Sequence, residues 1–208
     1  VPLVTEANVF IVGDMQSDMV PLPGAQAEAK AVAKAFSASR YDVRALYSAV
    51  AEDVFEALFH SRYRFMHLAG HGVVRRKVGD AEFTGMVLGK DIFLTSAQVA
   101  QMRHVPEFVF INCCFLGDMK ADAQPRFGEL AANLATQFIE MGCKAVIAAG
   151  WAVDDAAAST FAQTFYGAML TGKRFGQAVL DARSATYRKH PGLNTWGAYQ
   201  CYGDPSYT

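Results

Sequence analysis

Short apolar runs alternate along the chain with longer segments of periodic hydrophobicity. The runs Val109-Phe110-Ile111 and Ala145-Val146-Ile147 contain no polar residue, which is typical of strands buried on both faces of a sheet. The longer segments carry apolar residues every three to four positions, as amphipathic helices do. The pattern predicts strands at residues 8–12, 42–47, 64–69, 107–112, 144–149 and 196–201, and helices at residues 24–36, 52–59, 127–140, 156–170 and 175–188.

This alternation predicts an α/β fold with a mostly parallel six-stranded sheet and helices on both faces. A length of 208 residues suits one buried core, so we expect a single domain over residues 1–208. The first residue is Val rather than Met, which leaves open that this domain is part of a longer protein. We also expect a hairpin around residues 83–88 and an exposed, mobile loop at residues 117–126.

The charge distribution argues against several classes of function. The formal net charge is -1, and the basic run Arg75-Arg76-Lys77 is short and soon followed by Asp80 and Glu82. We interpret that run as a solvated loop rather than a phosphate site, and we expect no contact with nucleic acid. No stretch approaches the roughly 18 apolar residues of a membrane helix, and we expect no secretory signal because residue 1 onward shows no basic region before an apolar run. The four cysteines include no Cys-x-x-Cys pair, which favours a reducing, cytoplasmic location.

Two predicted strand ends carry residues capable of nucleophilic chemistry. The third strand leads into Gly70-His71-Gly72, where we expect an imidazole exposed at a tight turn, and the fourth leads into Asn112-Cys113-Cys114. Catalytic groups of parallel sheets collect beyond the carboxyl ends of the strands. If these strands are neighbours, His71 and Cys114 form a nucleophile with its proton acceptor. The alternative is a buried cysteine and a loop histidine without a joint role.

The pleat of the strand selects one of the two adjacent cysteines. Successive side chains point to opposite faces, so one cysteine faces the core while the other reaches the crevice. Cys114 lies further toward the carboxyl end and is the candidate nucleophile, which leaves Cys113 as a small core residue. We also interpret Cys143 and Cys201 as core residues.

The sequence offers weak support for a metal or a cofactor. His67 and His71 are four residues apart, but the segment is predicted as a strand, where this spacing does not make a zinc pair. We therefore expect a buried, hydrogen-bonded His67 and no metal site. Gly13-Asp14 follows the first strand without a dinucleotide or phosphate fingerprint, so we expect no cofactor. A doubly wound domain that binds a small molecule is accordingly a distant alternative.

Several motifs together resemble a known family. In chain order they are Gly13-Asp14, Leu22-Pro23-Gly24-Ala25 with Glu28, His67-Leu68-Ala69-Gly70-His71-Gly72, Phe110-Ile111-Asn112-Cys113-Cys114, Gly150-Trp151-Ala152-Val153-Asp154-Asp155, Phe165-Tyr166, residues 178–183, and Trp196-Gly197-Ala198-Tyr199 with Gly203-Asp204-Pro205. Their order and spacing are similar to those of the CHAT peptidase family, a caspase-like branch that also resembles separases. In that register Cys113 replaces the usual Ala and Cys114 is the nucleophile.

The resemblance implies a three-layer caspase-like sandwich and cysteine endopeptidase chemistry on a protein substrate. His71 would accept the thiol proton and later protonate the leaving amine. The backbone N–H groups of Gly72 and Cys114 would form the oxyanion hole. The family needs no third catalytic member. A catalytically silent caspase-like interaction module is the main alternative.

The resemblance also suggests where a substrate side chain would bind. Asn112 would line the first pocket, and the segment from Trp151 to Asp155 its neighbouring wall. An acid in this segment binds a basic residue in the separase-like motif, and Asp155 aligns best with it, followed by Asp154. Either acid can instead cap the helix that begins near Ala156. We predict cleavage after Arg or Lys.

Domains of this family are commonly joined to helical repeats or other sensor modules, often in bacterial signalling or defence systems. The resemblance therefore implies a sensor or activator as a partner, either fused or separate. The loop at residues 117–126 directly follows the nucleophile, and we expect it to act as an activation element.

Overall fold

The computed structural model describes residues 3–4, 6–115 and 127–208. The predicted activation loop therefore lies outside the described residues. The elements are β1 (Leu3–Val4), β2 (Asn8–Met15), α1 (Pro23–Ala38), β3 (Asp42–Ala49), α2 (Ala51–His60), β4 (Phe65–Val78), β5 (Ala81–Gly89), β6 (Ile92–Thr95), α3 (Ser96–Val99), β7 (Val105–Pro106), β8 (Phe108–Phe115), α4 (Phe127–Glu140), β9 (Ala145–Ala149), α5 (Asp155–Leu170), α6 (Phe175–Lys189), α7 (Thr195–Ala198) and β10 (Tyr199–Gly203).

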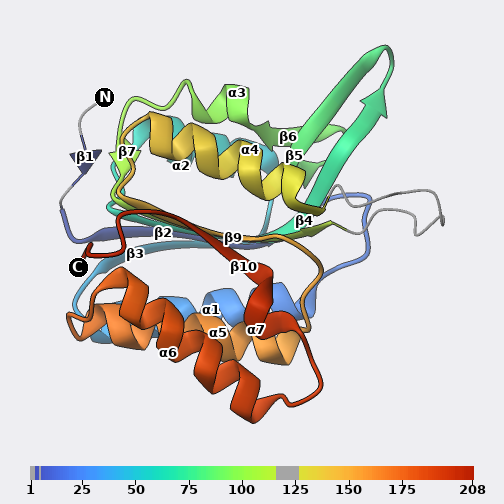
Figure 1. Ribbon diagram of the computed structural model, residues 1–208. Coiled ribbons are helices and arrows are strands. Elements are labelled where there is room, and N and C mark those ends of the chain that lie inside the picture. The colour runs from blue at the N-terminus through green and yellow to red at the C-terminus, as the bar shows by residue number, and fades with distance from the viewer. Residues whose placement is uncertain (1–2, 5, 116–126) are drawn as a thin grey trace.

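The molecule is a three-layer sandwich, as predicted (Figure 1). The central sheet has the strand order β10-β9-β8-β4-β2-β3, with β10 antiparallel to β9 and the other neighbours parallel. Helices α2 and α4 cover one face, while α1, α5 and α6 cover the other (Figure 1). The central strands are apolar on both faces because each face is buried under helices.

Strand β4 continues far beyond the end that its apolar run predicts. β4 does not stop before Gly70-His71-Gly72 but runs to Val78, where its second half pairs with β5, and β5 in turn pairs with β6. This part forms a long hairpin that rises beside α4 (Figure 1). A small apolar cluster of Val73, Val87 and Phe93 supports it. The predicted solvated loop at residues 75–77 is thus an exposed part of a strand.

A second correction concerns the cysteines. Cys113 and Cys143 are buried in the core that faces α4, as predicted. Cys201 is exposed, contrary to the prediction. It lies on β10, an outer strand of the sheet, which pairs only with β9 in the part of the chain that the structure describes.

A charged cluster closes the amino-terminal ends of the central strands. The buried carboxylate of Glu107, just before β8, accepts hydrogen bonds from Arg64 Nε at 2.7 Å and from Lys144 Nζ at 2.8 Å. The Tyr207 hydroxyl donates to the same carboxylate at 3.1 Å. Burial alone would raise the pKa of Glu107, but the hydrogen bonds from Lys144 and Arg64 hold it below its ordinary value. This cluster fastens the end of the chain to the sheet.

Candidate active site

The pairing of β4 and β8 brings the two predicted catalytic positions together. The strands are parallel neighbours, and their register sets the Cα of His71 opposite that of Cys114 and the Cα of Gly70 opposite that of Cys113. Strand alternation sets position 114 on the face shared by Phe110 and Asn112. The side chain of Cys114 itself lies outside the described part of the structure. The two strands are therefore neighbours in the sheet, as predicted.

The His71 ring is buried rather than exposed at a turn, because β4 continues past it. Only 3% of the residue is accessible, and Nε2 lies 2.7 Å from the carbonyl oxygen of Val20. A carbonyl only accepts hydrogen bonds, so Nε2 is the donor in this contact, and in the neutral form of this tautomer the lone pair is on Nδ1. That Nδ1 is buried and has no hydrogen-bond partner among the described residues. Within the described ranges, the ring thus offers Nδ1 as a base.

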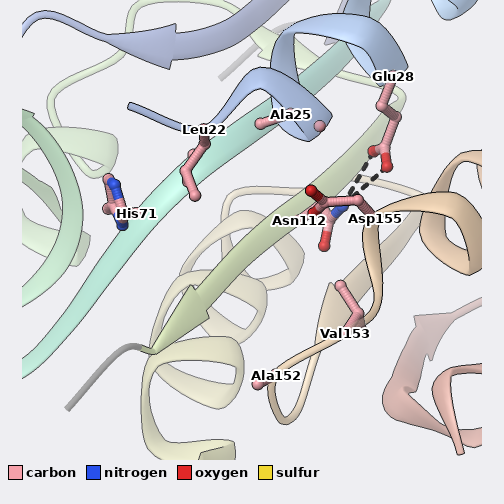
Figure 2. A pocket seen from close by; sticks show the side chains of 10 residues that line it. Leu22, Ala25, Glu28, His71, Asn112, Ala152, Val153 and Asp155 are labelled. Atoms are coloured by element: carbon pink, nitrogen blue, oxygen red, sulfur yellow. Dashed lines mark hydrogen bonds between the residues drawn. The ribbon is translucent and has the colours of Figure 1, made fainter. Parts of the chain in front are cut away.

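A cavity of about 170 Å³ opens beside His71. It lies where the start of α1, the middle of β4 and β8, and the segment after β9 converge (Figure 2). Its lining is Leu22, Gly24, Ala25, Glu28, Gly70, His71, Asn112, Ala152, Val153 and Asp155. Leu22, Ala25, Ala152 and Val153 supply aliphatic walls, while Glu28, Asn112 and Asp155 gather at one end, away from His71 (Figure 2). Such a shape suits a long side chain with an apolar stem and a polar tip.

The buried acid Glu28 forms the most unusual part of this lining. It is 1% exposed and accepts hydrogen bonds from Asn112 Nδ2 at 3.1 and 2.9 Å (Figure 2). His67 Nε2 lies 3.1 Å from its Oε1, although at an angle outside that of a hydrogen bond, and His67 Nδ1 contacts the Tyr166 hydroxyl at 3.1 Å. Among the described residues, Glu28 pairs with neither a lysine nor an arginine.

The two aspartates after β9 have separate positions. Asp154 is the N-cap of α5, and its carboxylate accepts the N–H of Ala157 at 2.9 Å. Asp155 instead lines the cavity. Its pKa is raised above the ordinary value, first by burial and then by the negative charges of Asp154 and Glu28. A Cβ added to Gly24 would lie 2.1 Å from Asp155 Cγ, so a glycine there gives Asp155 its space.

Two other predicted residues lie elsewhere. Trp151 does not line this cavity, and its ring is near Gly197, where an added Cβ would lie 3.7 Å from it. Gly72 is buried, and an added Cβ there would lie 2.3 Å from a methyl carbon of Leu130. The direction of an oxyanion-hole donor at Gly72 stays a prediction.

The structure adds two groups that sequence reasoning did not assign to the site. Glu28 could have been suspected as an acid between Ala25 and Ala29, on the apolar face of the first helix. The contact of the Val20 carbonyl could not have been predicted, because a backbone oxygen is present at every residue.

The described residues contain no cluster of three or more histidine, cysteine, aspartate or glutamate side chains that could hold a metal ion. No helix within the described ranges is long and apolar enough to cross a bilayer.

Comparisons with known proteins agree with this architecture. A family model described as "CHAT domain" matches residues 2–204. One similar solved structure is that of the Arg specific cysteine proteinase gingipain R, with a TM-score of 0.64 and 15% identity over 97% of this chain and 47% of that one. Another is a complex of Porphyromonas gingivalis RgpB pro- and mature domains, with a TM-score of 0.61 and 14% identity over 98% and 48%.

The chain thus spans about half the length of these structures. At this level of identity they show the caspase-like fold and not the activity. A search of curated proteins found no match. Because the family model covers nearly all of the sequence, the chain belongs to the CHAT domain family.

Proposed function

We propose that this chain is a cysteine endopeptidase that cuts a protein substrate after a basic residue, with His71 and Cys114 as its catalytic pair. The observation that carries the proposal is the register of β4 and β8, which sets these two positions opposite each other beside an acidic cavity. Membership of the CHAT domain family and the caspase-like fold support the same chemistry.

The reaction follows from the available base on His71. Nδ1 takes the proton of the Cys114 thiol, and the resulting thiolate attacks the scissile carbonyl carbon. The N–H groups of Gly72 and Cys114 are the proposed donors to the negative oxygen that develops. The C–N bond then breaks, and the proton on His71 passes to the leaving amine. Water, deprotonated by His71, hydrolyses the thioester and restores the thiol.

The Val20 carbonyl contributes during the charged steps. When His71 holds a second proton, the ring is a cation, and a hydrogen bond from Nε2 to a carbonyl is stronger than in the neutral ring. The contact at 2.7 Å therefore favours the thiolate–imidazolium pair over the neutral pair. It also keeps Nδ1 as the reacting nitrogen.

The cavity supports a basic residue before the cut. A buried carboxylate gains from a permanent positive partner, and among the described residues Glu28 has the His67 ring 3.1 Å from its Oε1 but no lysine or arginine. An Arg or Lys side chain of the substrate would supply that permanent charge, with its stem along Leu22, Ala25 and Val153. Asp155 adds a second carboxylate at the same cavity. Gingipain R, which shares the fold, is described as Arg specific.

We further propose that the domain works in the cytoplasm, in a bacterial signalling or defence system, under the control of a sensor or activator. The cytoplasmic location rests on the cysteine pattern, and the signalling or defence role and the activator rest on the family resemblance.

A screen of new protein N-termini tests the proposal. A bacterial lysate would be treated with the wild type and, separately, with Cys114→Ala. We expect new termini in the wild-type sample only, preceded by Arg or Lys. Equal cleavage by both proteins would reject the catalytic pair. Cuts that follow Asp would reject the proposed specificity, and a lysate without cuts, together with uncut Arg and Lys peptides, would favour the silent module.

A further inference from the structure

The connection between β2 and α1 lies on the surface but carries a group that contacts the catalytic ring. Val20 is 78% exposed as a residue, whereas its carbonyl oxygen contacts His71 Nε2 at 2.7 Å. Within the connection, the Met19 N–H donates to Ser17 Oγ at 3.2 Å. The Gln16 N–H donates to the Ala49 carbonyl at 3.0 Å, and Met19 packs against the cluster of Val73, Val87 and Phe93. A surface segment held by so few hydrogen bonds needs a further anchor to hold one carbonyl in place.

Asp14, at the end of β2, provides such an anchor. It is 3% exposed and has a φ of 58°, which is uncommon for a residue other than glycine. Its Oδ1 accepts the N–H of Met15 at 3.0 Å, and its Oδ2 accepts the N–H of Leu22 at 2.8 Å. One buried carboxylate therefore joins the two ends of the connection that carries Val20.

We propose that Asp14 is a positioning residue, which holds the 16–21 connection so that the Val20 carbonyl fixes the orientation and tautomer of His71. The catalytic consequence rests on the proposed peptidase function, whereas the effect on the ring does not. Asp14 itself does not line the cavity, and both of its oxygens are directed at backbone N–H groups. It therefore acts through His71 rather than on the substrate.

A carboxylate suits this task better than its amide. Two acceptor oxygens serve two N–H groups, whereas an asparagine offers one acceptor and loses one of the bonds. Asparagine tolerates the left-handed backbone, so Asp14→Asn changes the hydrogen bonds without adding strain. Asp14→Ala removes both bonds and places a residue without this tolerance at φ 58°.

The test compares Asp14→Asn and Asp14→Ala with Asp18→Asn in the full chain. Asp18 is an exposed acid of the same connection and makes no ion pair within the described ranges, so its variant controls for the loss of charge. The first readout is the His71 tautomer, measured from ¹⁵N chemical shifts in the uninhibited protein. The second is kcat and KM on an Arg peptide, and the third is the rate at which iodoacetamide alkylates Cys114 across pH.

We expect the wild type and Asp18→Asn to carry the His71 proton on Nε2, and the Asp14 variants to show a mixture of tautomers. By the usual size of one or two lost hydrogen bonds, kcat should fall about threefold in Asp14→Asn and about tenfold in Asp14→Ala. KM should change little, and alkylation at neutral pH should slow in parallel with kcat.

Folded Asp14 variants that keep the wild-type His71 tautomer and kcat would overturn the inference. A rise in KM alone would also overturn it, since Asp14 would then shape the cavity through Leu22. If Asp14→Ala does not fold, Asp14→Asn decides. If the Asp14 variants show the expected change of His71 tautomer but the wild type cuts no peptide, the proposed function is defeated and the positioning role stands.

Discussion

Two buried carboxylates occupy opposite ends of the parallel strands and have opposite surroundings. Glu107, at the amino-terminal ends, has Arg64 and Lys144 as ion-pair partners. Glu28, near the carboxyl-terminal ends, contacts the amide of Asn112 and the ring of His67 and borders a cavity. The first acid is neutralised by its own chain and stabilises the fold. The second borders the cavity where we propose that a basic substrate residue binds, and that difference would mark the functional end of the sheet.

The largest expected effect on activity comes from a substitution of Glu28. Glu28→Gln keeps the shape of the side chain but removes the charge that a basic substrate residue would meet. Removal of one partner of a buried charge pair usually costs 2–5 kcal/mol, so we expect kcat/KM on Arg and Lys peptides to fall about 100-fold or more. The measurement is kcat/KM on matched peptides with Arg, Lys, citrulline and Gln before the cut.

Glu107→Gln is the matched control, because it makes the same change at the other end of the sheet. It should leave the preference for basic residues intact. An equal loss of preference in both variants would show that Glu28 acts on the fold rather than on the substrate.

The second prediction concerns stability. Glu107→Gln leaves Arg64 and Lys144 without their carboxylate, but both cations are partly exposed, so the loss of unfolding free energy should be about 2 kcal/mol. Urea denaturation monitored by circular dichroism measures it. A loss of stability that is larger in Glu28→Gln than in Glu107→Gln would reverse the roles assigned to the two acids.

The third prediction concerns the space for Asp155. Gly24→Ala places a Cβ 2.1 Å from Asp155 Cγ, so we expect the aspartate to turn away from the cavity. We expect kcat/KM on Arg peptides to fall about tenfold, which corresponds to about 1.4 kcal/mol. Gly167→Ala, in α5, is the control, because a Cβ there meets no atom within 4 Å. Unchanged kinetics in Gly24→Ala would exclude Asp155 from substrate recognition.

The smallest expected effect is a difference in pH between two events, the protonation of Asp155 and the loss of stability as Glu107 is protonated. The pKa of Asp155 is raised above 3.8, so Asp155 takes up a proton at a higher pH than an ordinary aspartate does. The pKa of Glu107 is held below 4.5, so its stabilisation is present above that pH and is lost as the pH falls through the lower folded value. On acidification, the Arg-to-citrulline ratio of kcat/KM should decline before the protein unfolds.

The ratio of kcat/KM on the two substrates cancels the pH dependence of the catalytic pair, because both substrates require the same pair. Simultaneous loss of the ratio and of the folded structure would argue against a separate role of Asp155.

Much of the fold follows from local patterns. The apolar runs around Val109 and Val146 identify central strands because burial on both faces leaves no place for polar residues. The adjacency of the His71 and Cys114 strands also agrees with the expectation drawn from strand ends and family motifs. Alternation along β8 correctly assigns Cys113 to the core.

The failures have physical causes as well. The second half of β4 carries Arg75-Arg76-Lys77, and its strand conformation depends on a partner, β5, with a register shift between Val73 and Arg76. Such pairing is a tertiary property, and the exposed position of Cys201 on an outer strand is another. The orientation of His71 depends on a backbone carbonyl, and every residue has one, so the sequence does not indicate which carbonyl contacts the ring.

Covalent capture of the nucleophile tests the central claim most directly. An Arg chloromethyl ketone would be incubated with the protein, and the modified residue located by mass spectrometry. Burial raises the pKa of Cys143 to about 12, so that thiol should not compete at neutral pH. We predict a single adduct, on Cys114, in the wild type. The adduct should be absent in His71→Ala, and the chloromethyl ketone with norleucine in place of Arg should not form it. An adduct on another cysteine, or equal labelling by the two reagents, would contradict the account.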